Sequence, residues 1–173
     1  MAVVSPRQRL EALRRLGIST AVIELAAGNN RRAAFDYYCT TPYMVYACAD
    51  APAGDPLVPM WEDRGGGVTA VRPAETGLEF LEFSVEAPQE YRIVARTEQG
   101  LLAHLFITLY EACDEPDAEA ALLEDAASVG FLYCSELVSA YDAAEHRTFE
   151  EHQSFVGAFV DSVDRRALGD ASA

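Results

Sequence analysis

Four side chains that could bind a metal or move a proton lie within one short stretch, His146, Glu150, Glu151 and His152. His146 and Glu150 are four residues apart and share one helix face only if a helix begins before His146. Thr148 and Glu151 have the spacing of a capping box, which predicts that the helix begins at Thr148. No H-E-x-x-H or E-x-x-H sequence occurs. The stretch therefore predicts solvated side chains at a helix end, and we expect no metal site.

Two further positions could support nucleophilic or acid–base chemistry. Cys134 precedes a predicted helix, whose N-terminus could stabilise a thiolate, but the apolar residues before it indicate a buried cysteine. His104 lies among Leu and Phe residues on another predicted helix, which is typical of a histidine in or beside a core rather than of a general base. Among 28 Asp and Glu, any catalytic pair would be chosen arbitrarily. We assign no catalytic residue and no cofactor, and the sequence favours a binding protein over an enzyme.

The glycine run and the arginines argue against two other kinds of site. Gly65-Gly66-Gly67 lies between two strand-like segments rather than before a helix, and the chain has no lysine for a phosphate-binding loop. A hairpin turn is predicted there. Arg31-Arg32 and four arginines near the N-terminus are the basic clusters of a chain with net charge −15. That charge repels nucleic acid and anionic membranes, so we expect neither as a partner.

The negative charge is unevenly distributed along the chain. Residues 1–60 carry a net charge of +1, and residues 61–173 carry −16. Between Glu111 and Glu151 there are twelve Asp or Glu and one base, Arg147. Codon bias in a GC-rich genome explains part of the acidity and the absence of lysine, but it does not explain the uneven placement. A field of this kind favours basic partners.

Length and cysteine content bound the architecture. With 173 residues, half of them apolar, the chain can bury one sizeable core, so a single domain over residues 1–173 is predicted. No apolar run reaches the roughly 18 residues of a membrane span, and residues 1–16 lack the apolar core of a secretory signal. The four cysteines form no C-x-x-C pair. We therefore expect reduced thiols and a cytoplasmic protein.

Helices are predicted at both ends of the chain. Ser5-Pro6 with Gln8 has the pattern of a capping box that begins a first helix, and Gly17 can end it. The other predicted helices span residues 19–27, 98–113 with Thr97 as the cap, 117–128, 135–145, and a final segment from Thr148 that frays from about Leu168.

A sheet is predicted in the middle of the chain. Aromatic and β-branched residues indicate strands at residues 35–39, 43–48, 57–62, 68–71, 78–85 and 91–95. Residues 63–67 form the turn of a hairpin within this set. About five or six strands would then form one central sheet, mostly antiparallel or mixed, flanked by helices. The predicted fold class is α+β, with helical N- and C-terminal segments.

Two features indicate a surface that binds another protein. Trp61, the only tryptophan, stands beside Glu62 and Asp63 at the predicted hairpin, and an aromatic anchor next to charge is typical of interface hot spots. Trp61 could equally close one end of the core. The second feature is the acidic tract after Tyr110. The candidate partner-binding residues are Trp61, Glu62, Asp63, Glu111, Asp114, Glu115, Asp117, Glu119, Glu124 and Asp125.

The segment Pro56-Leu57-Val58-Pro59-Met60-Trp61-Glu62-Asp63, followed by Gly67-Val68-Thr69, resembles part of the SMI1/KNR4-like group, also called the SUKH superfamily. The similarity continues through Phe80-Leu81-Glu82-Phe83-Ser84 and the segment from Gln99 to Leu105. It covers residues 56–110, about a third of the chain. The Leu-Pro-x-x-Tyr segment usual near the N-terminus of that group is missing.

The resemblance implies a mixed α+β fold without catalytic residues. Many bacterial members of the group are immunity proteins that bind and neutralise toxins, often nucleases, and fungal relatives act in signalling scaffolds. It therefore predicts a non-catalytic protein-binding module that neutralises a basic toxin such as a nuclease. Two alternatives stay open. One is a regulatory scaffold without a toxin, and the other is a small-molecule-binding protein or enzyme with a pocket lined by Tyr37, Tyr38, Tyr43, Tyr46 and His104.

Overall fold

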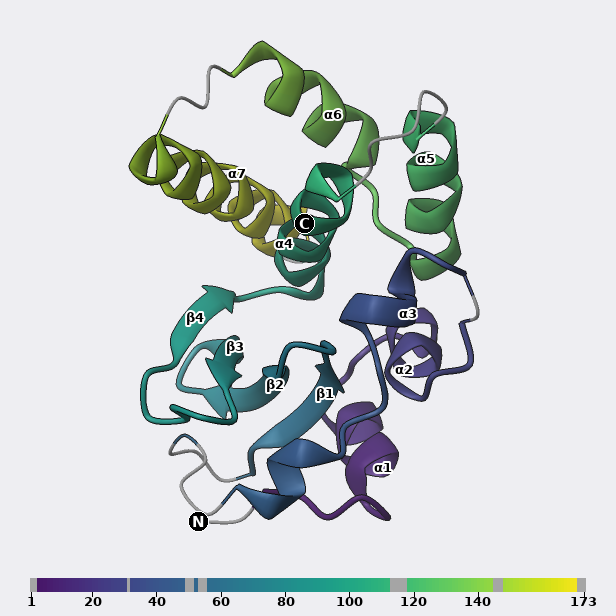
Figure 1. Cartoon of the computed structure of the whole chain (residues 1–173), viewed down its shortest axis with the longest axis vertical. Coiled ribbons are helices and arrows are strands. Elements are labelled where there is room, and N and C mark those ends of the chain that lie inside the picture. The colour runs from purple at the N-terminus through teal and green to yellow at the C-terminus, as the bar shows by residue number, and fades with distance from the viewer. Residues whose placement is uncertain are drawn as a thin grey trace. The chain divides into compact units, whose positions relative to one another are not determined.

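A computed structural model describes residues 3–30, 32–48, 52, 56–112, 118–144 and 148–170. The chain divides into two compact units, Met1–Ile93 and Val94–Ala173. The first unit combines short helices with strands, and the second is built from four helices in the part that the structure describes (Figure 1). The α+β class predicted from the sequence is confirmed.

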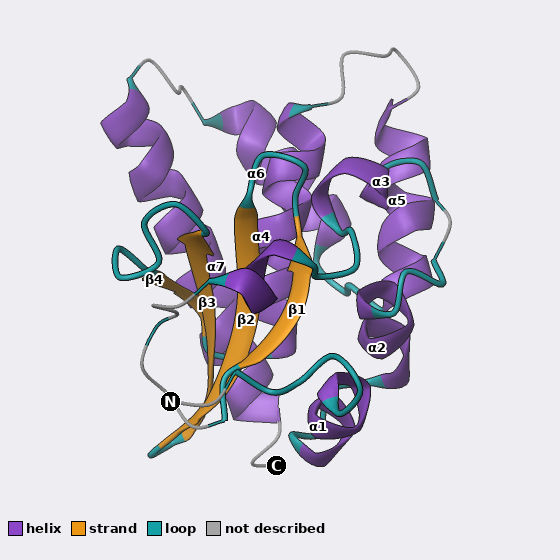
Figure 2. Ribbon diagram, turned by 60° about the horizontal axis from the view of Figure 1, so that its bottom comes forward, coloured by secondary structure: helices purple, strands orange, loops and turns teal. Residues whose placement is uncertain are grey.

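The strands form one four-stranded sheet in the order β1-β2-β3-β4. Figure 2 shows β1, β2 and β3 side by side in this order. Their bounds are Val58–Glu62 for β1, Gly67–Ala74 for β2, Gly77–Ser84 for β3 and Arg92–Ala95 for β4. β1 pairs antiparallel with β2, and β2 pairs antiparallel with β3. The predicted hairpin is therefore present, and Glu62 pairs with Val68 at its closed end.

One cluster of buried side chains in the first unit lies on one face of this sheet, and the opposite face is buried as well, since Val71 and Phe80 are 0% exposed. Alternate residues of β2 and β3 turn their side chains to the face of the cluster, and each is at most 4% exposed. Tyr46 and two valines pack against the edge of the cluster. The buried cluster consists of Val45, Leu57, Val68, Ala70, Leu81 and Phe83.

Two predicted strands are wrong. Residues 35–39 contain the short helix α3 (Phe35–Tyr38), and residues 43–48 contain the 3-10 helix η1 (Met44–Ala47). The sheet consequently has four strands rather than five or six. In this segment only Thr40 forms a bridge to the sheet, antiparallel to Glu62. Short aromatic and apolar runs fit a strand and a buried helical turn equally well, so periodicity alone misassigned them.

Both predicted N-terminal helices are present, but the first of them begins later than predicted. Helix α1 (Arg9–Arg15) starts after Gln8, whose side chain does not cap it; Ser5 Oγ donates instead to Gln8 Oε1 at 2.8 Å. Helix α2 (Thr20–Ala26) lies within the segment predicted to be helical, residues 19–27, and Ser19 Oγ caps it by accepting the N–H of Val22.

The buried guanidinium of Arg9 joins three elements of the first unit. It donates to the carbonyl of Met60 in β1 at 2.8 Å and to the carbonyl of Ala26 in α2 at 2.9 Å. Arg9 belongs to α1, and the residue is 4% exposed. Burial lowers the pKa of Arg9, with the Tyr46 hydroxyl group as a smaller opposing influence. Arg9 thus serves the fold, although the sequence indicated only a basic cluster.

The second unit is organised around α4 (Glu98–Glu111), which contacts the other three helices. These are α5 (Ala118–Val129), α6 (Cys134–Ala143) and α7 (Phe149–Asp170). Thr97 caps α4 as predicted, since its Oγ1 accepts the N–H of Gly100 at 3.0 Å. The capping box of Thr148 and Glu151 is also formed. Helix α7 continues through Leu168, the residue from which the sequence predicted fraying.

A buried carboxylate fixes the beginning of α4 to α7. Asp164 is 6% exposed and accepts hydrogen bonds from the backbone N–H groups of Arg96 and Thr97 at 2.8 and 2.9 Å. It also accepts from the Thr97 hydroxyl at 2.6 Å. Because N–H groups at a helix N-terminus lack intrahelical partners, a carboxylate there stabilises the helix end. Among the described residues, no helix is both long and apolar enough to cross a membrane.

Candidate functional site

The carboxylate of Glu62 accepts three backbone hydrogen bonds inside the first unit. The donors are the N–H groups of Tyr43 at 2.9 Å, Met44 at 3.0 Å and Val45 at 2.7 Å. Glu62 is 2% exposed. Its charge is therefore used to hold the start of η1, and it offers no surface to a partner in this structure. A buried carboxylate persists where such donors replace its hydration.

The two neighbours of Glu62 also serve the fold. Trp61 is 3% exposed and belongs to the core, the alternative that the sequence left open. Asp63 Oδ1 accepts the N–H groups of Gly65 and Gly67 at 2.7 and 2.8 Å, which closes the β1–β2 turn. A Cβ on Gly67 would lie 2.4 Å from Asp63 Oδ2, so this glycine gives the carboxylate its room. The three neighbouring residues therefore serve the fold together, as a structural motif.

The acidic candidates of the second unit differ in exposure. Glu119 and Glu124 are exposed on α5, whereas Asp125 on the same helix is only 8% exposed. Glu111 lies at the end of α4 and its side chain is 31% exposed. Three further candidates lie outside the described residues, namely Asp114, Glu115 and Asp117.

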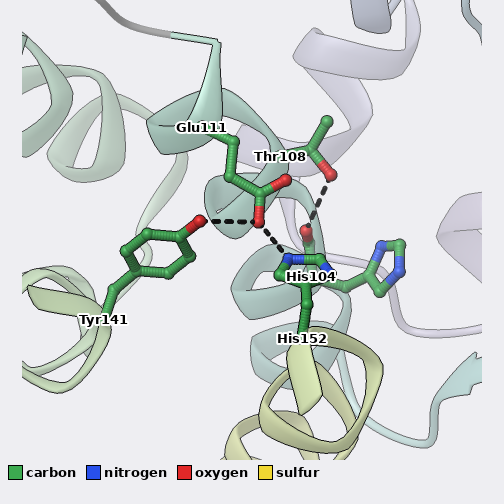
Figure 3. Close-up of polar contacts among 5 residues, drawn as sticks. All are labelled: His104, Thr108, Glu111, Tyr141 and His152. Carbon is green, nitrogen blue, oxygen red and sulfur yellow. Dashed lines mark hydrogen bonds and ion pairs between the residues drawn. The ribbon is translucent and has the colours of Figure 1, made fainter. Parts of the chain in front are cut away.

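Glu111 is the centre of a polar cluster that joins three helices. The Nε2 atom of His152 on α7 contacts Glu111 Oε1, and the hydroxyl of Tyr141 on α6 donates to the same oxygen at 3.2 Å (Figure 3). His152 is part-exposed, with 23% of its side chain accessible. A histidine, a carboxylate and a phenol are the groups of general acid–base catalysis. Here the shared oxygen binds them to one another, which favours a role in holding the helices.

Sequence reasoning placed His152 with His146 and missed its partner Glu111. The two residues are 41 positions apart, and no local pattern joins them. His146 lies outside the described residues. In the part of the chain that the structure describes, no three His, Cys, Asp or Glu side chains form a group that could hold a metal ion.

A second tyrosine–carboxylate pair lies beside this cluster. The Tyr110 hydroxyl on α4 donates to Asp142 Oδ1 on α6 at 2.7 Å. This hydrogen bond is the main cause that raises the pKa of Tyr110 to about 12, with burial and the charge of Asp142 contributing in the same direction. The rings of Tyr110 and Tyr141 meet edge to face, with centroids 5.3 Å apart. The pair strengthens the α4–α6 contact.

The remaining chemical candidates are buried. Cys134 begins α6 and is 3% exposed, and burial raises the pKa of its thiol to about 11, with smaller contributions from Glu119 and Asp125. It is therefore a thiol at neutral pH, as the apolar residues before it indicated. His104 is 9% exposed on α4, and its backbone carbonyl accepts the hydroxyl of Thr108 (Figure 3).

The tyrosines proposed to line a pocket do not share one environment. Tyr43 is 82% exposed and Tyr37 is 48% exposed, whereas Tyr46 packs against the core of the first unit. All of them belong to the first unit, and His104 belongs to the second.

With the fold and these sites described, the chain was compared with known proteins. Its sequence and structure matched no protein family, no curated protein and no solved structure in these comparisons.

Proposed function

We propose that this chain is a non-catalytic protein-binding module whose second unit docks a basic partner. The observation that carries the proposal is the division of charge between the units. Residues 94–173 contain sixteen Asp or Glu against four Arg, a net charge of −12. Residues 1–93 contain twelve against nine, a net charge of −3. The acidity therefore belongs to the helical unit.

Part of this charge is used within the unit. Asp164 is buried, Glu111 and Asp142 accept hydrogen bonds from tyrosines, and Glu136 pairs with Arg166 at 2.7 Å. Other acids stand at the surface of α5 and α7. The exposed ones are Glu119, Glu124, Glu150, Glu151 and Asp161.

An acidic surface of this kind mainly affects the rate at which a partner binds. Complementary charge steers a basic protein toward the surface and raises the association rate constant, and added salt weakens this attraction. The resemblance to SMI1/KNR4-like proteins supports a toxin, such as a nuclease, as the partner. A nuclease needs a positive surface to hold its substrate, so an acidic protein could cover that surface.

The first experiment identifies the partner. The full chain is used to capture proteins from its source organism at low salt, and the genes beside its own are examined for a multidomain toxin. Recovery of a basic protein, released by salt, is the expected result. Capture of acidic or neutral proteins only would contradict the proposal.

The second experiment tests the surface with matched variants. One variant combines Glu119→Gln, Glu124→Gln and Glu150→Gln in the second unit. The control combines Glu75→Gln, Glu86→Gln and Glu90→Gln, which are exposed acids of the first unit. The first variant should lower the association rate constant several-fold and weaken its salt dependence, with the control close to wild type. Equal effects of the two variants would overturn the assignment to the second unit.

A further inference from the structure

A groove of about 300 Å³ runs along helix α1 in the first unit. The helix and its two caps contribute five residues to the lining, spaced three and four apart, so that they share one face. Since a helix rises about 1.5 Å per residue, this face extends for about 12 Å. We call this elongated space the α1 groove. The five residues are Gln8, Glu11, Ala12, Arg15 and Leu16.

Four aliphatic side chains line the α1 groove. Ala12 and Leu16 belong to the helix face, and Val4 and Pro56 complete the lining. Each of the four is half-buried, so each still offers apolar surface to a ligand. An elongated aliphatic lining suits an extended hydrocarbon chain, because every methylene group removed from water there favours binding.

The two sides of the α1 groove are fixed to the same sheet. On the helix side, Arg9 ties α1 to β1 through the carbonyl of Met60 at 2.8 Å. On the other side, the N–H of Val4 donates to the carbonyl of Leu57 at 2.9 Å, next to Pro56. The groove is therefore preformed, which lowers the entropy cost of binding a ligand in it.

Arg15 supplies a positive charge to the α1 groove. Its Nε donates to Glu11 Oε1 at 3.2 Å, which orients the guanidinium. Within the part of the chain that the structure describes, the N–H groups on its two Nη atoms have no acceptor. Glu11 also pairs with Arg14, whose Nη1 lies 3.8 Å from Glu11 Oε2. Two arginines thus stand against one carboxylate, and the local net charge is +1.

We propose that the α1 groove binds a small aliphatic carboxylate, with its hydrocarbon chain along Ala12 and Leu16 and its carboxylate paired with Arg15. The Nη groups of a guanidinium match the two oxygens of a carboxylate. A cationic ligand would find only Glu11, which two arginines already neutralise. The volume lies at the lower end of the roughly 300–1,000 Å³ of small-molecule sites, so a medium-chain acid fits better than a long-chain one.

This proposal is independent of the proposed function, since the α1 groove belongs to the first unit and its test needs no partner protein. The net charge of −15 opposes the approach of every anion. The experiments therefore compare ligands that share one hydrocarbon chain, and variants that share one net charge.

The first experiment titrates the isotope-labelled full chain with octanoate and follows its amide signals by NMR. Saturable shifts should concentrate in α1 and at Val4. Octanamide has the same hydrocarbon chain without the charge, and it should bind several-fold more weakly. Equal Kd values for the two ligands would overturn the pairing with Arg15. Shifts that do not saturate, or that lie elsewhere in the chain, would overturn the site.

The second experiment compares two arginine variants. Arg15→Gln should raise the Kd of octanoate to that of octanamide. Arg14→Gln is the matched control, because it removes the same charge from a residue that pairs with the same Glu11 but does not line the α1 groove. Its Kd should stay close to that of the wild type. Equal losses in the two variants would show diffuse attraction and refute the pairing.

The third experiment fills the α1 groove. Ala12→Phe, once thermal unfolding has shown that it is folded, should abolish binding of both ligands, and unchanged binding would contradict the site. A second copy of the chain could also cover these aliphatic side chains. Sedimentation equilibrium should therefore give a monomer for both wild type and variant, and a dimer that Ala12→Phe dissociates would overturn the proposal.

Discussion

A Cβ placed on Gly100 would lie 2.0 Å from Asp164 Oδ1. The two residues belong to α4 and α7, and the missing side chain of one makes room for the buried carboxylate of the other. The contact explains a glycine at the third position of a helix, where alanine has the higher helix propensity. The close approach of Gly100 to Asp164 is therefore part of the same helix cap as the hydrogen bonds between Asp164 and Thr97.

Gly100→Ala should lower the free energy of unfolding by about 2 kcal/mol, because the added methyl group has to displace Asp164 from its three donors. Urea denaturation measures the change. Gly157→Ala is the matched control, since Gly157 is also helical and a Cβ there would meet nothing within 4 Å. The control should raise the free energy of unfolding by about 0.5 kcal/mol. Similar values for the two variants would show that Asp164 does not occupy this position.

Glu62→Gln should destabilise the chain by about 3 kcal/mol, because an amide supplies one acceptor oxygen where three backbone N–H groups now bind a carboxylate. Equilibrium urea unfolding is again the measurement. Glu86→Gln, at an exposed residue of the same unit, should change stability by less than about 0.5 kcal/mol. A small effect of Glu62→Gln would mean that this carboxylate is not the anchor of η1.

The thiols of Cys39 and Cys134 should resist alkylation in the native protein. Burial raises the pKa of both, that of Cys134 to about 11, so few thiolates are present at pH 8 and access is also blocked. With Cys113 replaced by Ser, Cys48 should react first, since it is the most exposed cysteine among the described residues. Mass spectrometry after timed alkylation gives the order. Rapid labelling of Cys134 would contradict its burial.

Alkaline titration should identify Tyr110. Its folded pKa, about 12, lies above the value of about 10 for an unfolded tyrosine, so the folded state holds this proton more tightly. The contribution to stability is complete below about pH 10 and is lost as the pH rises toward 12. Ultraviolet absorbance of tyrosinate and unfolding at several pH values measure both effects. Asp142→Asn should lower the pKa of Tyr110, and an unchanged titration would show that the hydrogen bond is not its cause.

Local signals in the sequence predicted much of the fold. The caps at Thr97 and Thr148 and the glycine turn after Asp63 were found because each signal lies within five residues. The strand predicted at residues 43–48 is wrong because the N–H groups at the start of η1 donate to Glu62, 17 to 19 residues further along. The strand predicted at residues 35–39 is wrong because its short aromatic run fits the helix α3 equally well.

The candidate site was less predictable for the same reason. The sequence singled out Trp61, Glu62 and Asp63 as partner-binding candidates, because their chemistry alone could not tell a contact surface from a buried anchor. Glu111 and His152 meet only in the folded chain. Charge composition, by contrast, needs no tertiary information, and the net charge of −16 over residues 61–173 was visible in the sequence.

The cap that Asp164 provides has a consequence for synthesis on the ribosome. Arg96 and Asp164 are 68 residues apart, so translation at about 5–20 residues per second separates their emergence by roughly 3 to 14 s. During that interval the first turn of α4 has Thr97 as its cap but lacks the carboxylate. Helix α7 thus completes the cap of α4, which is made earlier, and a nascent chain that stops short of Asp164 exposes this helix end to chaperones and proteases.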